Sequence, residues 1–258
     1  MRVIIVTQEE PFYIPVFLGK ILAKFKTVVA VVILPGVPYG FTRLSHIKRL
    51  FDVFGLRDFI IYGTLFSYYK FLNLASRVIS LSRFYSVECA AKMNSVPVYK
   101  PKNINAPGFL NILRALEPDV IASVASPQVF KSDIIRVPKL AAINIHAALL
   151  PKYRGMMPRF WVLAKGEEKT GVTVHYIDQN IDTGNIILQK TIDITSQETL
   201  HSLQKKIADV GALALLEALE KMEKGDATGA PPSGESSYYS FPTKEAAREF
   251  RRRGRKFI

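Results

Sequence analysis

The feature that most limits the fold of this chain is the alternation of short apolar runs with helical patterns. Residues 2–6 and 27–34 are rich in valine and isoleucine, and residues 17–25 between them have helical spacing of apolar side chains. A helical stretch at 106–116 precedes another apolar run at 119–124. Strands that alternate with helices build parallel sheets with crossover helices. The sequence therefore predicts an α/β fold with a mostly parallel sheet flanked by helices.

The remaining elements follow from the same kind of pattern. Ser126 and Pro127 resemble a helix N-cap and first position, and Thr195 or Ser196 is expected to cap a long helix that Gly225 ends. We also expect strands at 97–99, 171–177 and 185–194, and a helix at 158–165. No Gly-x-Gly-x-x-Gly follows the first strand, so the sequence gives little support for dinucleotide binding.

A polar pair follows the apolar run at residues 140–143. Asn144 and His146 lie two residues apart at this strand end, so their side chains point to the same side. Asp182, on a turn between two later strands, supplies a carboxylate. An amide, an imidazole and a carboxylate are the groups that acyl transfer to an amine needs. Taken singly, an Asn or a His is more often a structural hydrogen-bonding residue.

Several linked segments make the functional interpretation more specific. Asn144-Ile-His146, Leu149-Leu-Pro-Lys-Tyr-Arg-Gly155, Gly171-Val-Thr-Val-His175 and Asp182-Thr-Gly184 resemble, in order, the signature of the folate-dependent formyltransferases. This family includes the glycinamide ribonucleotide, methionyl-tRNA and amino-sugar formyltransferases. The resemblance implies a Rossmann-like catalytic domain at 1–195, with a C-terminal helix and basic tail at 196–258.

The resemblance also implies roles for individual residues. Asn144, His146 and Asp182 match the catalytic trio of the family, with 10-formyltetrahydrofolate as the co-substrate and no metal. Contacts to the folate are expected from two loops, at Gln128, Val129 and Phe130 and at Ile177, Asp178 and Asn180. A buried Asp182 beside His146 is expected to favour the imidazolium.

The acceptor side departs from the family pattern. Many relatives have Pro and Ser after the His, whereas this chain has Ala147 and Ala148, which leaves the acceptor open. Tyr153 and Arg154 are candidate substrate-binding residues, although Arg154 is equally suited to pinning the loop. His175 is either a second proton carrier or, more commonly for a strand histidine, a structural hydrogen-bonding residue.

Relative to the family pattern, residues 40–90 form an insertion, with apolar residues at helical spacing from Phe71 to Leu81. It either packs as extra helices on the core or on a second subunit, which we favour, or rests on a membrane or shapes a substrate pocket. Residues 251–256 are basic, and a solvated or frayed tail is expected there in preference to one that touches an anionic partner.

Composition restricts the compartment and the partners. The net charge of +13 suits a polyanionic partner such as a nucleotide, tRNA or an anionic membrane, or simply a soluble basic protein. The single cysteine and the lack of a signal-peptide pattern or a long uncharged apolar stretch predict a cytoplasmic protein. The scattered histidines give no zinc-site spacing.

We therefore expect formyl transfer from 10-formyltetrahydrofolate to a primary amine, most simply that of an amino-sugar nucleotide. The resemblance implies a β-barrel domain after the catalytic region in the methionyl-tRNA branch, and we expect no room for one here, which argues against tRNA. The alternatives are a methionyl-tRNA formyltransferase, a formyltetrahydrofolate hydrolase, and a non-catalytic folate-binding or membrane-associated protein. The sequence leaves the oligomeric state open.

Overall fold

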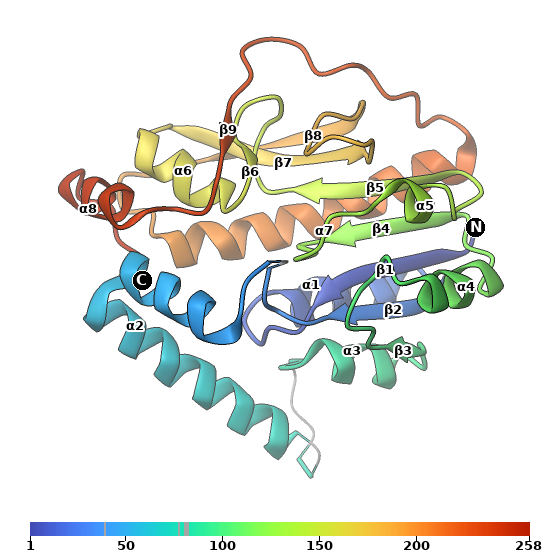
Figure 1. The fold of residues 1–258 in the computed structure, drawn as a ribbon, viewed down its shortest axis with the longest axis horizontal. Helices are drawn as coiled ribbons and strands as arrows, with labels where there is room; N and C mark the ends of the chain where they lie inside the picture. The colour runs from blue at the N-terminus through green and yellow to red at the C-terminus, as the bar shows by residue number, and fades with distance from the viewer. Residues whose placement is uncertain (39, 77, 80–82) are drawn as a thin grey trace.

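The computed structural model describes the chain except residues 39, 77 and 80–82. Its centre is a sheet of seven strands in the order β3-β2-β1-β4-β5-β7-β8 (Figure 1). Strands β1 to β5 pair in parallel, while β7 runs antiparallel to both β5 and β8. The strands are β1 Val3–Gln8, β2 Val28–Leu34, β3 Val98–Tyr99, β4 Val120–Val124, β5 Ala141–His146, β7 Lys169–Tyr176 and β8 Ile186–Asp193. The predicted α/β fold with a mostly parallel sheet is confirmed.

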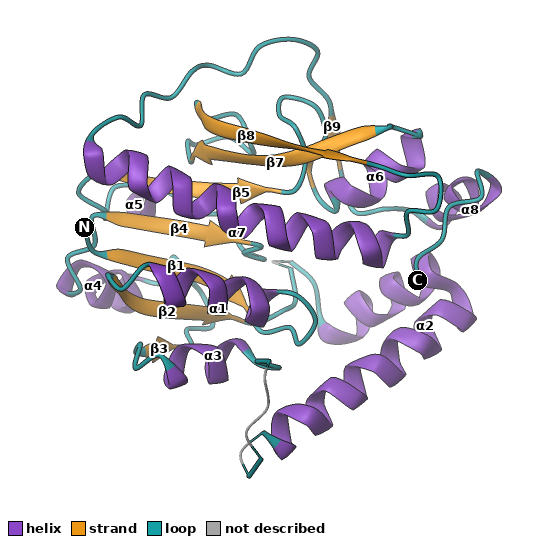
Figure 2. Cartoon of the chain, turned by 180° about the vertical axis from the view of Figure 1, so that it is seen from behind, coloured by secondary structure: helices purple, strands orange, loops and turns teal. Residues whose placement is uncertain are grey.

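Helices cover both faces of this sheet, as the two opposite views show (Figures 1 and 2). The central strands are therefore buried on both sides. Along β1, Val3 and Ile5 point into the core under one layer, whereas Ile4 and Val6 point into the core under the other. The first layer contains α1 (Ile14–Lys24), α3 (Val87–Met93) and α7 (Leu200–Lys224), and the second contains α4 (Pro107–Ala115) and α5 (Ser132–Ile135). Helix α6 (Pro158–Lys165) follows the loop after β5.

Two predicted helix starts are wrong. Residues 126–131 are not helical, because the Ser126 hydroxyl donates to the backbone carbonyl of Gln128 and closes a local turn. Helix α5 therefore begins only at Ser132. Helix α7 is capped by Thr199, whose side chain accepts from the Ser202 N–H in a capping box, so neither Thr195 nor Ser196 is the cap. Gly225 ends this helix as predicted, in the left-handed region.

The basic residues of the C-terminal tail are mostly exposed, as expected, but the tail is folded and not frayed. Residues Lys244–Arg252 form α8, and the chain then returns to the core. Phe250 and Phe257 are fully buried and pack on the ring of Phe160 in α6. Upstream, β9 (Tyr238–Tyr239) pairs with β6 (Arg154–Gly155), so the C-terminal segment also braces the loop after β5. Three buried aromatic rings hold this end of the chain in place.

The insertion between β2 and α3 is mostly one long helix, α2 (Arg43–Ala75), which breaks at Gly55. Its first limb ends there, and the Arg251 guanidinium donates to the freed carbonyls of Val53 and Phe54. The expected packing on the core is limited to Val53, which is buried, and to Leu50, Phe54 and Tyr62, which are partly buried. The last part of the apolar pattern that ran to Leu81 falls at residues 77 and 80–82, outside the described residues.

Candidate active site

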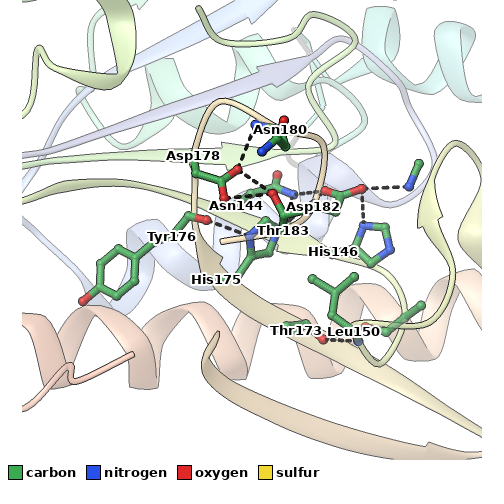
Figure 3. Close-up of polar contacts among 12 residues, drawn as sticks. Asn144, His146, Leu150, Thr173, His175, Tyr176, Asp178, Asn180, Asp182 and Thr183 are labelled. Carbon is green, nitrogen blue, oxygen red and sulfur yellow. Dashed lines mark hydrogen bonds and ion pairs between the residues drawn. The ribbon is translucent and has the colours of Figure 1, made fainter. Parts of the chain in front are cut away.

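The candidate site lies at the carboxyl end of β5, where the parallel strands of the sheet end. Asn144 and His146 project to the same side of β5, opposite His175 and Thr173 of the antiparallel strand β7. The loop after β7 folds back over this strand end and brings Asp182 to both residues (Figure 3). The Asp182 carboxylate lies with Oδ2 3.5 Å from His146 Nδ1 and Oδ1 3.4 Å from Asn144 Nδ2. The structure thus brings the predicted trio together.

Asp182 is held by the loop that follows β5. The Gly155 N–H donates to Asp182 Oδ2 at 2.8 Å. Gly155 has a φ of +95°, and a Cβ atom at this position would lie 2.3 Å from the backbone oxygen of Tyr239. Only glycine fits this crowded, left-handed position, so the Arg-Gly of the loop is required by the geometry of the carboxylate.

The turn that carries Asp182 is closed by its own side chains. The Asp178 carboxylate accepts from the Thr183 hydroxyl at 2.7 Å and from the Asn180 N–H at 3.0 Å. A Cβ atom at Gly184 would lie 1.9 Å from the backbone oxygen of Tyr176, so the turn also needs its glycine. Asp182 itself has a positive φ of 55°, an uncommon conformation that this closed turn maintains.

Hydrogen bonds fix the tautomers of the two histidines. His146 Nε2 lies 2.8 Å from the backbone oxygen of Tyr153, which can only accept, so Nε2 carries a proton. In the neutral ring, Nδ1 is then an unprotonated base that faces Asp182. His175 Nδ1 donates in the same way to the Tyr176 carbonyl at 2.8 Å. Its Nε2 therefore accepts from Asn144 Nδ2 at 3.1 Å, which orients the amide.

Burial decides the charge of His146. Desolvation lowers the pKa of this imidazole below its ordinary value, and the opposing effects of Asp182 and the Tyr153 carbonyl do not overcome it. The expectation that the imidazolium is favoured is therefore wrong for the free protein. Burial raises the pKa of Asp182, but the nearby histidines and the Gly155 N–H outweigh it and lower that pKa to about 2. The resting site is thus a neutral imidazole beside a carboxylate.

The loop after β5 is anchored by residues that the sequence reasoning did not assign. The Thr173 hydroxyl donates to the Ala148 carbonyl at 2.7 Å and accepts from the Leu150 N–H at 3.1 Å. The Gln189 amide donates to the Leu150 carbonyl at 2.9 Å. Thr173 is buried opposite His146, and a threonine amid valines on a buried strand is the signal that points to it.

The two predicted substrate residues have different surroundings. Tyr153 is buried, its hydroxyl donates to Glu167, and its ring stacks on Tyr239, so its side chain is committed to packing. Its backbone carbonyl, however, sets the tautomer of His146. Arg154 has a buried Nε with no hydrogen-bond partner among the described residues. Of the two side chains, only that of Arg154 has a donor left for a ligand.

The predicted folate-binding residues lie in two loops beside the trio. The Gln128 side chain is engaged by the Ile104 N–H and the Lys102 carbonyl, both at 2.9 Å. Phe130 is buried in the core under α4 and α5, where Ile177 packs against the same cluster. Val129 is 61% exposed. These loops therefore present backbone groups and apolar surface to a ligand in preference to charged side chains.

Metal binding finds no support in the part of the chain that the structure describes. No group of three or more His, Cys, Asp or Glu side chains there is arranged to hold an ion. The chemistry of the site rests on its hydrogen-bonding groups: a donor amide, a base with a defined free nitrogen, and a carboxylate, on the edge of a parallel α/β sheet. These parts define a candidate acyl-transfer site.

Comparison with known proteins identifies the family. A sequence model described as "Formyl transferase" matches residues 73–219, which is more than half of the chain. The chain therefore belongs to the formyl transferase family, as its motifs predicted. It is 42% identical over 134 residues to a methionyl-tRNA formyltransferase of Clostridioides difficile, covering 52% of this chain and 43% of the relative. It is 40% identical over 152 residues to that of Pelotomaculum thermopropionicum, covering 59% and 49%. The chain thus spans about half the length of these relatives, or less.

Solved structures of the family have the same fold. A phosphoribosylglycinamide formyltransferase from Anaplasma phagocytophilum superposes with a TM-score of 0.62 at 15% identity, covering 93% of this chain and 98% of that one. An N-formyltransferase from Helicobacter canadensis, in complex with folinic acid and dTDP-3-aminofucose, gives a TM-score of 0.59 at 19% identity, covering 93% and 71%. At these identities the likeness concerns the fold alone.

Proposed function

We propose that the chain transfers a formyl group from 10-formyltetrahydrofolate to a primary amine, with Asn144, His146 and Asp182 as the reacting groups. The observation that carries this proposal is the fixed tautomer of His146. Its Nε2–H is held by the Tyr153 carbonyl, so the free Nδ1 faces the cluster of Asp182 and Asn144. A buried neutral imidazole in this arrangement is suited to act as a general base.

In this mechanism His146 Nδ1 takes the proton that the amine loses as it attacks the formyl carbon. The resulting imidazolium has its new N–H directed at Asp182 Oδ2, 3.5 Å away. A carboxylate with a pKa of about 2 remains charged throughout, so it stabilises the imidazolium as it forms. His146 can then pass the proton to the departing folate nitrogen, with Asp182 holding the ring in position.

Asn144 is proposed to stabilise the oxyanion. Its amide nitrogen donates to His175 at 3.1 Å and to Asp182 at the longer distance of 3.4 Å. The longer bond is the weaker one, and the hydrogen that makes it is the one available for a negatively charged oxygen in the site. His175 retains the shorter bond and keeps the amide oriented, so we assign it a positioning role.

The donor is proposed to bind against the two loops beside the trio. 10-Formyltetrahydrofolate would supply the formyl group. Exposed Val129 and the backbone of residues 126–130 lie after β4, the parallel neighbour of β5. Ile177 and Phe130 share one core cluster, so the second loop packs next to the first. The residues present fit a pterin held by backbone groups and apolar contacts, with Asp178 and Asn180 maintaining the turn.

For the acceptor we propose the amine of an amino-sugar nucleotide or a similar small anionic molecule. The unpartnered Nε of Arg154 and the net charge of +13 support an anionic acceptor. Methionyl-tRNA is the second candidate, because relatives bearing that name share about 40% identity with this chain over slightly more than half of its length.

The acceptor is tested by release of tetrahydrofolate from 10-formyltetrahydrofolate with a panel of amino-sugar nucleotides and with charged initiator tRNA. We expect release that depends on one sugar nucleotide and is weakened by Arg154→Gln, with Lys205→Gln on α7 as the matched control. Release only with the tRNA would reassign the acceptor. Release with no acceptor would make the protein a hydrolase. Folate binding without any release would support the alternative of a non-catalytic folate-binding protein.

A further inference from the structure

Helix α2 exposes an unusual amount of apolar surface. Val53 is its one buried residue, whereas nine large apolar or aromatic side chains are 42% to 81% exposed. They are Leu44, Ile47, Phe51, Leu56, Ile60, Phe66, Tyr68, Phe71 and Leu74. Figures 1 and 2 both show α2 at the edge of the molecule, beside the sheet. Exposed apolar side chains in this number are typical of an interaction site.

Four of these side chains lie along one edge of the second limb of the helix, which follows the break at Gly55. Leu56, Ile60, Phe71 and Leu74, the α2 stripe, fall within an arc of about 60° at 3.6 residues per turn. The opposite edge faces the protein, where Tyr62 contacts Phe54 and Phe12. The limb therefore has one edge against the body of the protein and one uncovered apolar edge, and it runs for about 30 Å. Between Ile60 and Phe71 this edge carries the small residues Gly63, Thr64 and Ser67, so the apolar side chains lie at its two ends.

Positive charge accompanies the stripe. The basic residues of α2 (Arg43, Lys48, Arg49, Arg57 and Lys70) outnumber its acidic ones (Asp52 and Asp58). Asp58 is paired with Arg251 at 3.7 Å, so these two charges offset each other. At the break in the helix, a groove of about 530 Å³ is lined by Arg57, Arg251, Arg255 and Lys256. Leu56 lines the same groove, so the stripe begins where this basic cluster lies.

We propose that α2 and the basic groove at its break bind the surface of an anionic phospholipid bilayer. The stripe would lie among the upper acyl chains, with the arginines and lysines beside lipid phosphates. Within the described residues no helix is long and apolar enough to cross a membrane, so contact at the surface is the mode that fits. The proposal stands independently of the formyl transfer.

Charge favours this occupant over the others. A second copy seated on the same face would bring together two proteins of charge +13, whereas an anionic surface attracts that charge. A nucleic acid would use the basic residues, but its phosphates make no use of exposed Ile60 and Phe71. A bilayer uses both features.

The test is co-sedimentation of the full chain with vesicles of phosphatidylcholine containing 30% phosphatidylglycerol, and with pure phosphatidylcholine vesicles. We expect binding to the anionic vesicles alone, lowered about tenfold or more by Ile60→Ser with Phe71→Ser, and similarly by Arg57→Glu with Lys256→Glu. The matched controls are Leu140→Ser with Leu213→Ser, which change exposed leucines elsewhere, and Arg136→Glu. Circular dichroism confirms that each variant is folded.

Three results would overturn the proposal. The first is no binding to anionic vesicles. The second is binding that the control variants weaken as much as the α2 variants do. The third is the absence of vesicle binding together with another occupant of this face. That occupant would be a second copy, if Ile60→Ser with Phe71→Ser dissociates a dimer in solution, or tRNA, if Arg57→Glu with Lys256→Glu weakens its binding.

Discussion

Replacing Asp182 by Asn tests how the carboxylate is used, since the substitution removes a charge and keeps the shape. The pKa of Asp182 is lowered from 3.8 to about 2, and its side chain is 11% exposed. A shift of this size corresponds to about 2.5 kcal/mol of interaction with the charged form. Asn also sets an NH₂ group against either the Gly155 N–H or the Asn144 amide, because both of those groups donate to Asp182.

The sign of the pH dependence follows from the direction of the shift. A depressed pKa contributes stability that is present above the unfolded-state value of 3.8 and is lost as the pH falls towards 2. Part of the shift comes from a charged His146, which is neutral at pH 7, so we expect Asp182→Asn to lower the free energy of unfolding by about 1–2.5 kcal/mol at pH 7 and by less at pH 3. If the same interaction supports the imidazolium of His146, kcat falls about 50- to 100-fold.

Urea unfolding from pH 7 to pH 3 measures the first effect and needs no knowledge of the acceptor. Asp178→Asn, in the same turn but outside the trio, serves as the comparison for loss of a turn-closing carboxylate. A difference between Asp182→Asn and the native chain of less than about 0.5 kcal/mol at pH 7, or one that grows as the pH falls, would refute the reasoning.

Three further predictions concern the loop, the core and the base. Gly155→Ala should destabilise the fold by about 2 kcal/mol or more in urea unfolding, because of its positive φ and the 2.3 Å approach to Tyr239, whereas Gly63→Ala, in open space on α2, should not destabilise it. Phe250→Ala should cost about 3–5 kcal/mol in the same assay, since its ring is fully buried between others; a loss below 1 kcal/mol would mean that the C-terminus is loosely attached. The acid limb of the kcat/KM profile, which reports groups of the free enzyme, should have its midpoint below pH 6.5, because burial lowers the pKa of His146 and the neutral ring is the active base; a midpoint above 6.5 would contradict this.

The parts of the fold that the sequence predicted correctly are those with strong local patterns. The valine-rich runs of β1, β2 and β4 have a length and composition that only buried strands share, and α6 occupies the predicted residues 158–165. Asn144 and His146 lie on one side of β5 because alternation along a strand admits no other arrangement. The proximity of Asp182 came from the family motif, since sequence separation alone does not place it.

The predictions that were wrong share a physical cause. Each relied on a local sequence pattern, and the structure is set instead by a side-chain hydrogen bond, by burial or by contacts between residues distant in sequence. Ser126 and Pro127 match the pattern of a helix start, but the Ser126 hydroxyl donates to the Gln128 carbonyl and closes a turn instead. The basic residues at the end of the chain are exposed as expected, but this end is not frayed, because Phe250 and Phe257 fill a core position beside Phe160 that nothing local reveals. The charge expected on His146 followed from Asp182 alone and left out the desolvation of a ring that is only 5% exposed.

The central claim is that His146 is the base of a formyl transfer and is dispensable for folate binding. The most direct measurement is single-turnover release of tetrahydrofolate from bound 10-formyltetrahydrofolate in the presence of the accepted amine, for the native chain, His146→Ala and His46→Ala. We expect release to be lost with His146→Ala at unchanged folate affinity, and to be kept with His46→Ala on α2. Equal release from the native chain and His146→Ala would contradict the claim.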